Sequence, residues 1–235
     1  MTAAHIADLP LTTRLFHIGG SVYRISAAED QEALLAATAS RPLVPFGLML
    51  WESAIVLAEA LAEGAALGGQ RILELGAGVG LPGIVAARLG ADVTAIDIDP
   101  LALDVARNNA GQNGCASNYR TLVASWRDVP SLSEFNCVIG ADIAYDHDDV
   151  GHVARWLDHA MRPGGRALLT DPDRPTGAAL VAELKSRGGV VSTKPMTTPD
   201  LKTPGRTISV TLIRAAHAPS SGPASGLRST DGDCP

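Results

Sequence analysis

The chain has 235 residues, of which 46% are hydrophobic, and its formal net charge is −6 at pH 7. A chain of this length can bury a sizeable core as one α/β domain with appendages. The acidic balance argues against a nucleic-acid partner, because phosphate binding depends mainly on Lys and Arg. The sequence presents neither the pattern of a secretory leader nor an apolar run of membrane-spanning length. We therefore expect a cytoplasmic protein that binds neither nucleic acid nor membrane, and the oligomeric state stays open.

No metal centre is predicted from the sequence. The three cysteines lack the paired spacing of a metal site or a disulfide framework, which agrees with a reducing compartment; they are Cys115, Cys137 and Cys234. The acidic run 146–149 resembles a metal site in composition, but consecutive loop residues rarely converge on one ion. Helix capping by Asp148 or Asp149 is the interpretation we favour for that run.

The N-terminal part of the chain predicts a hairpin and two helices. Residues 13–26 alternate apolar and polar side chains around a Gly-Gly pair, a pattern typical of a β-hairpin. A polar helix is expected over 30–39. Two prolines then interrupt the chain before a strongly apolar helix over 48–61.

From residue 71 onward, short apolar runs alternate with helical patterns, as in a parallel sheet. The expected strands cover 72–75, 93–96, 119–124, 136–140 and 166–171, and the expected helices cover 81–89, 100–109, 149–161 and 177–187. Asp99 and Pro100 suit the N-cap and the first position of a helix. Two last strands, 189–194 and 206–213, are expected to pair antiparallel. Beyond about residue 215, the abundance of Ser, Pro, Gly and Asp predicts disorder.

The run ILELGAGVGLPGIVAARLGADVTAIDIDP, residues 72–100, predicts a nucleotide-binding unit of strand, glycine turn, helix and strand. The glycines let the backbone turn sharply and let a ligand approach, and the helix N-terminus presents free N–H groups. Asp97 ends the second strand, where a carboxylate can accept hydrogen bonds from both ribose hydroxyls. A dinucleotide fingerprint would need glycine at Leu81. Glu74 can instead hold the ammonium of an amino-acid-bearing nucleoside.

The pattern ELGAGVG is similar to motif I of the class I S-adenosylmethionine (SAM) methyltransferases. This resemblance implies an α/β, Rossmann-like, doubly wound seven-stranded sheet with an antiparallel last strand, to which the chain adds its N-terminal β-hairpin. It also implies SAM as cofactor and S-adenosylhomocysteine as product. The residues expected to bind the cofactor are Glu74, Gly76, Gly78, Gly80, Asp97, Ile98, Trp126 and Ala141.

In a doubly wound sheet the ligand lies outside the carboxyl ends of the strands, so the residues that follow each strand are site candidates. Trp126 follows the third strand, where its indole can stack on an adenine or anchor the surface. Asp142 and Tyr145 follow the fourth strand, where a loop cap and a packed aromatic ring are the alternatives to a catalytic role. Asp171 and Arg174 follow the fifth strand, where Arg174 can pair with Asp171 or steer an acidic substrate.

Three further elements are more specific: the DxxY of Asp142 to Tyr145, the segment PFGLMLWESAIVLAEAL and the later DPDR. They resemble the seven-β-strand protein lysine methyltransferases, the group that includes the electron-transfer-flavoprotein β-subunit and valosin-containing-protein lysine methyltransferases. The resemblance spans residues 41–175. It implies that Trp51 covers the methionine end of SAM and that the DxxY forms the target-amine end. One departure is Glu52, because the family often has Trp-Pro where this chain has Trp-Glu.

The resemblance implies transfer of a methyl group to an amine, with a protein lysine as the leading acceptor. A small metabolite or natural product methylated at N or O is the main alternative, and a non-catalytic SAM-binding interaction module is a third. Methylation of a nucleic-acid base is disfavoured, because the fourth strand ends in ADIAY rather than an NPPY-like turn. On this interpretation, residues 1–40 form an extension of hairpin and helix, 41–215 the methyltransferase domain, and 216–235 a disordered tail.

Overall fold

The computed structural model describes residues 6–64, 66–128 and 132–216. The expected disordered tail lies almost entirely outside the described residues, as does Cys234. The main sheet is formed by β3 (Arg71–Leu75), β4 (Asp92–Asp97), β5 (Tyr119–Val123), β6 (Phe135–Ala141), β7 (Met161–Asp171), β8 (Val190–Pro199) and β9 (Thr207–Ala216).

The seven strands lie in the order β5-β4-β3-β6-β7-β9-β8. The pairs from β5 to β7 are parallel, whereas β9 is antiparallel to both β7 and β8. The predicted sheet with its antiparallel last strand is therefore confirmed. The chain runs outward from β3 and then returns to β6 beside it, so the strand order reverses between these two strands. Ligands of doubly wound sheets bind outside the carboxyl ends at such a reversal.

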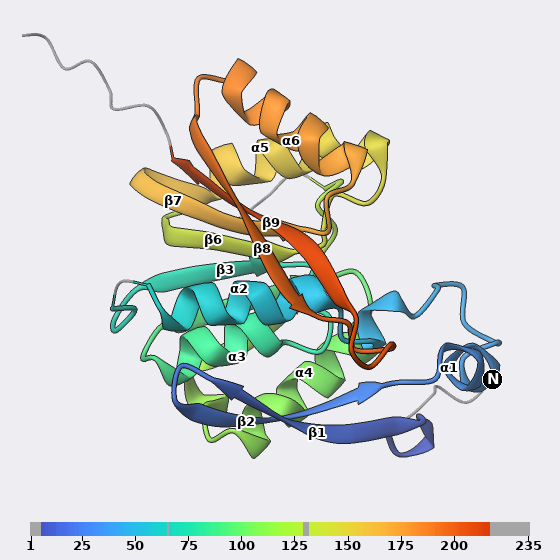
Figure 1. Ribbon diagram of the computed structural model, residues 1–235. Helices are drawn as coiled ribbons and strands as arrows, with labels where there is room; N and C mark the ends of the chain where they lie inside the picture. Colours follow the sequence, from blue (N-terminus) through green and yellow to red (C-terminus); the bar gives the residue numbers. More distant parts are fainter. Residues whose placement is uncertain (1–5, 65, 129–131, 217–235) are drawn as a thin grey trace, which may run out of the picture.

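Helices cover both faces of the sheet, giving three layers (Figure 1). One face packs against α2 (Glu52–Ala62), α3 (Leu81–Arg88) and α4 (Pro100–Gln112), and the other against α5 (Val150–Ala160) and α6 (Pro175–Ser186). Neighbouring strand residues enter opposite layers of the core, because strand side chains alternate in direction. Ile72 belongs to the core cluster on the α2 side, and Leu73 to the cluster on the α5 side.

The predicted hairpin is present and forms a separate two-stranded sheet of β1 (Leu11–Ile18) and β2 (Ser21–Ala28). Its turn contains Gly19 and Gly20 with φ of 56° and 75°, a backbone conformation that glycine adopts without steric cost. The predicted polar helix follows as α1 (Gln31–Ala37), which the Asp30 side chain caps. The hairpin lies below α4 in Figure 1, away from the main sheet.

Asn109 of α4 and Asn113, the C-cap residue of that helix, hold the hairpin in place. The Asn113 side chain accepts from the backbone N–H of Arg24 at 2.9 Å and donates to its carbonyl at 2.7 Å. Asn109 accepts from the Ser26 N–H at 2.9 Å and donates to the Ser26 carbonyl at 3.0 Å. The two amides, four residues apart on the helix, thus bond the edge of β2 as a neighbouring strand would.

Several element boundaries differ from the sequence expectation. The apolar helix begins at Glu52 rather than at residue 48, because Phe46–Leu48 form a separate 3-10 turn, η2, and Trp51 takes the N-cap position. The strand β7 begins at Met161, where it pairs with Phe135 across a register shift before the predicted start at residue 166. Across the described part of the chain, no helix has the length and apolar character needed to span a membrane.

Candidate active site

A cavity of about 540 Å³ lies at the carboxyl ends of the strands, beside the reversal between β3 and β6. It brings together every predicted site residue except Gly80 and Asp171. The predicted residues that line it are Trp51, Glu74, Gly76, Gly78, Asp97, Ile98, Trp126, Ala141, Asp142, Tyr145 and Arg174.

The glycine turn forms one wall of the cavity, and two of its glycines are required by close approaches. A Cβ at Gly76, where φ is 61°, would lie 2.9 Å from the Ile143 side chain and 3.1 Å from the Trp126 ring. A Cβ at Gly78, where φ is 53°, would lie 2.9 Å from the carbonyl oxygen of Gly47. A side chain at either position would therefore displace the opposite wall.

Gly80 was predicted to bind the cofactor, but it is not among the residues that line the cavity. A Cβ there would point at the Tyr119 hydroxyl, 2.6 Å away, and at Ala106 of α4. Gly80 is also the N-cap of α3, with φ of 88°. The missing side chain of Gly80 thus lets the start of α3 pack closely against Tyr119 of β5 and Ala106 of α4.

Asp97 connects the glycine turn to the end of β4. Its Oδ2 accepts from the Gly78 N–H at 2.8 Å, and its Oδ1 accepts from the Asp99 N–H at 2.9 Å. Burial raises the pKa of Asp97, and these two N–H groups oppose that rise. Each oxygen retains a lone pair for a further donor, so the carboxylate can also accept from ribose hydroxyls. Asp99 caps α4 as predicted, since its side chain accepts from the Leu101 N–H at 2.9 Å.

Glu74 lies behind the glycine turn and is only 2% exposed. One carboxylate oxygen accepts from the Gly83 N–H at 2.9 Å, and the other accepts from the Tyr119 hydroxyl at 3.1 Å. Burial is the main cause that raises the pKa of Glu74 to about 7. Through its contact with Gly83, the Glu74 side chain thus holds the first turn of α3 from inside the fold. Its predicted contact with a ligand ammonium stays a prediction.

Glu74→Gln is expected to remove a pH dependence of folding stability. Between pH 4.5 and about 7 the unfolded chain releases the Glu74 proton while the folded protein keeps it, so stability falls as pH rises through this window, by about 3 kcal/mol. Glutamine can retain the contacts to Gly83 and Tyr119 without titrating. Urea unfolding of both proteins across this range measures the difference. Parallel stability profiles for wild type and variant would contradict the expectation, and the exposed Glu63→Gln is the matched control.

Two aromatic side chains pack edge to face at the cavity. The ring centroids of Trp126 and Tyr145 are 6.1 Å apart, with an interplanar angle of 76°. Burial is the main cause that raises the pKa of the Tyr145 hydroxyl, with Asp149 and Asp97 adding to it. The hydroxyl therefore keeps its proton at neutral pH and can donate a hydrogen bond.

Asp142 forms an ion pair with Arg174 rather than lying free in the cavity. The Nη1 and Nη2 atoms of Arg174 both contact the Asp142 carboxylate, with Nη2 at 3.2 Å from Oδ2. Asp142 has φ of 57°, and its backbone N–H donates to the Thr170 carbonyl at 2.8 Å. The left-handed backbone turns the chain away from the end of β6. The Asp142 carboxylate therefore lies against Arg174, which follows the end of β7.

Asp171 does not line the cavity, in contrast to its predicted place on the substrate side. Its Oδ1 accepts from the backbone N–H of Arg174 at 2.7 Å, and its side chain packs against Gly177 of α6. The Arg174 guanidinium pairs with Asp142, and only its backbone bonds Asp171, so the predicted side-chain pair with Asp171 is not formed. Steering of an acidic substrate by Arg174 stays a prediction. Asp171 therefore fixes the backbone from which Arg174 reaches Asp142.

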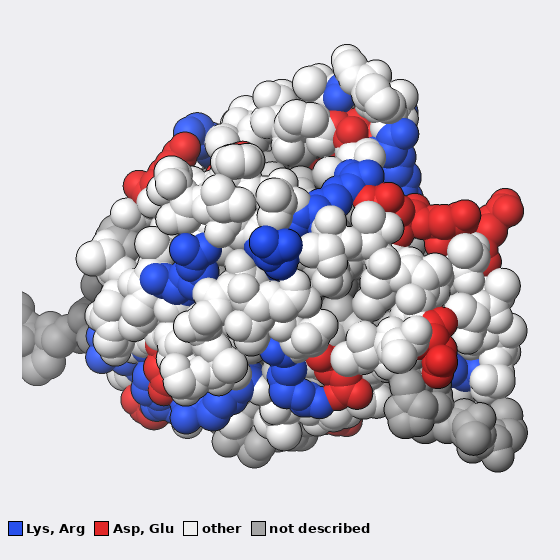
Figure 2. Space-filling view, turned by 90° about the horizontal axis from the view of Figure 1, so that it is seen from below, with Lys and Arg blue, Asp and Glu red and all other residues white. Residues whose placement is uncertain are grey.

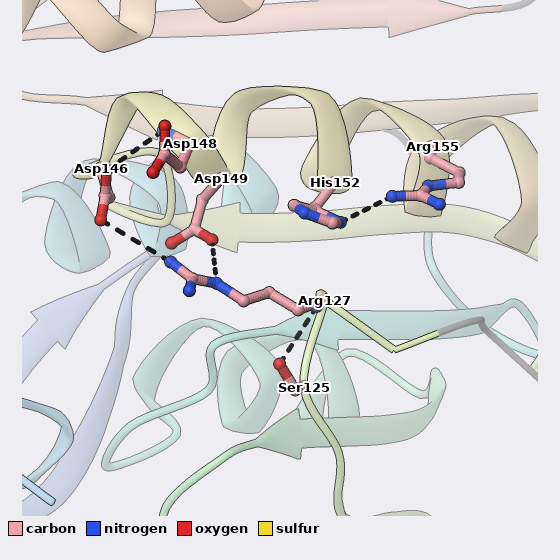
Figure 3. A network of polar contacts seen from close by, with 7 residues as sticks. All are labelled: Ser125, Arg127, Asp146, Asp148, Asp149, His152 and Arg155. Atoms are coloured by element: carbon pink, nitrogen blue, oxygen red, sulfur yellow. Dashed lines mark hydrogen bonds and ion pairs between the residues drawn. The ribbon is translucent and has the colours of Figure 1, made fainter.

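An ion-pair network joins the loop after β5 to the turn that precedes α5 (Figure 3). The Arg127 Nε donates to Asp149 at 2.6 Å, and its Nη2 lies 3.6 Å from Asp146. Asp146 caps this turn by accepting from the Asp148 N–H at 3.1 Å, whereas Asp149 takes the expected N-cap position of α5 without a capping hydrogen bond from its side chain. The Asp149 carboxylate instead accepts the hydrogen bond from Arg127.

Among the described residues, no group of His, Cys, Asp and Glu is arranged to hold a metal.

One wall of the cavity was not predicted as part of the site. It is formed by residues around the η2 turn, and these are Leu43, Val44, Phe46, Gly47, Met49 and Leu50. Phe46 and Val44 are exposed, although both are large and apolar. Arg41 ties this segment to Asp99, with one of its contacts at 3.0 Å. Four of these residues lie in the segment PFGLMLWESAIVLAEAL, which carries the family resemblance, and Met49 and Leu50 fell within the helix expected over 48–61, but none was expected to line a site.

The fold and the position of the cavity define a class I methyltransferase fold. Magnesium protoporphyrin IX methyltransferase from Synechocystis PCC 6803, solved with bound SAM, is similar with a TM-score of 0.57 and 19% sequence identity. The match covers 70% of this chain and 78% of that one. At this identity the similarity shows the fold alone.

Residues 32–177 match the family described as Lysine methyltransferase, so the chain belongs to this family and the resemblance is confirmed. Protein N-lysine methyltransferase METTL21A of Danio rerio is 36% identical over 129 residues, which are 52% of this chain and 59% of that protein. Histone-arginine methyltransferase METTL23 of Mus musculus is 34% identical over 113 residues, which are 45% and 44% of the two chains. The chain thus spans about half the length of these curated relatives.

Proposed function

We propose that the protein is a SAM-dependent methyltransferase and that its acceptor is a lysine side chain of a protein. The observation that supports this most is that one cavity is lined both by the glycine turn with Asp97 and by the DxxY pair, Asp142 and Tyr145. The family match and the name of the METTL21A relative favour lysine as the acceptor.

The residues of the cavity suit SAM. Asp97 offers acceptors for ribose hydroxyls, and the bare backbone at Gly76 and Gly78 leaves room for a ligand. Trp126 offers an aromatic surface for a base, and Trp51 lines the same cavity. The volume of about 540 Å³ lies within the range of about 300–1,000 Å³ that is typical of small-molecule sites.

When bound, SAM supplies a methyl group on a sulfonium, and its transfer to a neutral amine places positive charge on the attacking nitrogen. Asp142 is the candidate catalytic residue that favours this charge, since a carboxylate beside the nitrogen stabilises it in the transition state. Tyr145 can donate its hydroxyl proton in a hydrogen bond or wall the lysine channel with its ring. Most of the rate is expected to come from holding the reacting atoms in line.

The Asp142–Arg174 pair eases a conflict in this chemistry. A lysine with a pKa of about 10.4 must lose a proton before attack, which costs about 3 pKa units, or roughly 4 kcal/mol, at pH 7.4. An unpaired carboxylate would increase this cost by stabilising the ammonium. Because Arg174 neutralises part of that charge, the pair orients the amine with a smaller effect on its proton, and the remaining negative charge still favours the developing positive charge on the nitrogen. We therefore assign Asp142 to orientation and charge stabilisation before proton acceptance.

Calorimetry and labelling test the proposal in two stages. The protein is expected to bind SAM and S-adenosylhomocysteine but not NAD, and binding of NAD alone would contradict the cofactor assignment. Incubation with methyl-labelled SAM and a host lysate is then expected to place label in the protein fraction as methyllysine. Label confined to small molecules would overturn the lysine acceptor, and methylarginine would point to the chemistry named for the METTL23 relative.

We also propose that residues 41–215 form the methyltransferase domain, that residues 1–40 are an extension of it, and that the protein acts in the cytoplasm. The buried, unpaired Cys115 and Cys137 favour a reducing compartment. The hairpin of the extension packs beside the domain, with β2 against α4 and β1 against α2.

A further inference from the structure

A second cavity, of about 940 Å³, lies between the hairpin, α1 and the loop that joins β8 to β9. We call it the hairpin groove. Its lining residues are Thr12, Arg14, Phe16, Ile25, Ala27, Ala28, Glu29, Asp30, Gln31, Glu32, Leu35, Met49, Leu50, Leu201 and Lys202.

One face of the hairpin forms a wall of the hairpin groove. Thr12, Arg14 and Phe16 alternate along β1, and the first two pair directly with Ala27 and Ile25 of β2. Alternating residues of a strand, and their cross-strand partners, point to the same face. Because Asn109 and Asn113 fix the edge of β2 to α4, this wall is held in position without any ligand.

The hairpin groove combines an apolar interior with an acidic end. Glu29, Asp30 and Glu32 gather where β2 leads into α1, and Glu29 pairs with Arg14. Within the described residues, Asp30 and Glu32 form no ion pair, and both are exposed. Figure 2 shows acidic side chains gathered at the right-hand end of the lower face, the end at which Figure 1 places α1. A partner segment that carries Lys or Arg would complement this end.

The hairpin groove adjoins the candidate active site. Met49 and Leu50 line both cavities. Lys202 of the hairpin groove lies 5.0 Å above the ring of Trp51, which lines the active-site cavity. The Leu201 backbone N–H donates to Glu52 at 3.0 Å, so the residue that departs from the family pattern anchors this loop. A peptide segment bound in the hairpin groove would therefore extend toward Trp51 at the active-site cavity.

We propose that the hairpin groove binds the segment of the protein substrate that flanks the target lysine, and that this segment is apolar with basic residues directed at Glu32 and Asp30. The inference rests on the proposed function and names the substrate class of the same site. Apolar side chains of the segment contact Phe16, Leu35 and Leu50, while its basic residues reach the acidic end.

Two fluorescent 12-residue peptides test the inference with the full-length protein in the presence of S-adenosylhomocysteine. Each carries one lysine preceded by alternating leucine and charged residues, which are arginine in one peptide and glutamate in the other. Wild type is expected to prefer the arginine peptide. Glu32→Arg is expected to weaken its binding by about tenfold, and Leu35→Asp to weaken both peptides. Glu63→Arg, an exposed substitution outside both cavities, is the matched control and is expected to leave binding unchanged.

Steady-state methylation of the same peptides with SAM separates the two proposals. Glu32→Arg is expected to raise KM for the arginine peptide about tenfold and to leave kcat and SAM affinity unchanged. Failure of wild type to bind the arginine peptide, or equal binding by wild type and Glu32→Arg, overturns the groove assignment. Binding that depends on Glu32 without any methylation sustains the groove and contradicts the lysine methyltransferase activity instead.

Discussion

Replacing Asp142 by alanine is expected to lower kcat by about 10²- to 10³-fold, the usual effect of removing one electrostatic stabiliser of a transition state. The dissociation constant of SAM is expected to stay within a few-fold of wild type, because the contacts proposed for the cofactor come from the glycine turn, Asp97 and the aromatic residues. Single-turnover kinetics and calorimetry measure the two quantities separately. Equal losses of turnover and SAM affinity would place Asp142 among the cofactor-binding residues.

Arg174→Met provides a contrast, because it removes the partner and leaves the carboxylate. An unpaired Asp142 raises the pKa of a bound lysine, so activity near pH 7 is expected to fall and to recover as pH rises. Asp142→Ala leaves the arginine unpaired and is expected to lose activity at every pH. Identical pH profiles for the two variants would contradict the separate roles.

The matched control for both substitutions is Asp158→Ala, which removes an Asp–Arg pair on the surface. Asp158 pairs with Arg187 at 2.9 Å, away from the lining of the active-site cavity. This variant is expected to keep wild-type kcat, since exposed ion pairs contribute only about 0–1 kcal/mol to stability.

Asp97→Ala is expected to weaken SAM binding by at least about 100-fold, because hydrogen bonds to a charged group contribute about 1.5–3 kcal/mol each. The carboxylate is the predicted partner of both ribose hydroxyls, and it also holds the Gly78 and Asp99 N–H groups. Calorimetry measures the affinity, and a thermal melt without ligand reports the loss of the internal contacts. SAM affinity close to wild type would show that the ribose is not held by Asp97.

Asp92→Ala is the control for that experiment, since Asp92 lies at the opposite end of the same strand. Its carboxylate pairs with Arg120 at 2.8 Å on the surface. Both SAM affinity and melting temperature are expected to stay close to wild type.

Local features of this fold could be predicted because each depends on neighbouring residues. The glycine turn, Asp97 at the end of β4 and the cap at Asp99 all follow from residue type and short spacing, and the structure has them where they were expected. The doubly wound seven-stranded sheet with an antiparallel last strand followed from the family resemblance together with the alternation of strands and helices. The hairpin followed from its alternating side chains and Gly-Gly turn.

Features that join distant parts of the chain could not be predicted. The pairing of Asp142 with Arg174 depends on the left-handed backbone at Asp142 and on the neighbouring ends of β6 and β7. The bonds from Asn109 and Asn113 to β2 depend on how the hairpin packs on α4. Gly80 was predicted to face a ligand because sequence spacing alone does not reveal that Tyr119 lies beside it.

A crystal structure of the protein with S-adenosylhomocysteine tests the central claim most directly. We expect density for the nucleoside in the active-site cavity, with both ribose hydroxyls on Asp97, the base beside Trp126 and the sulfur facing the Asp142–Arg174 pair. Density at another place on the molecule, or a sulfur directed away from that pair, would contradict the claim.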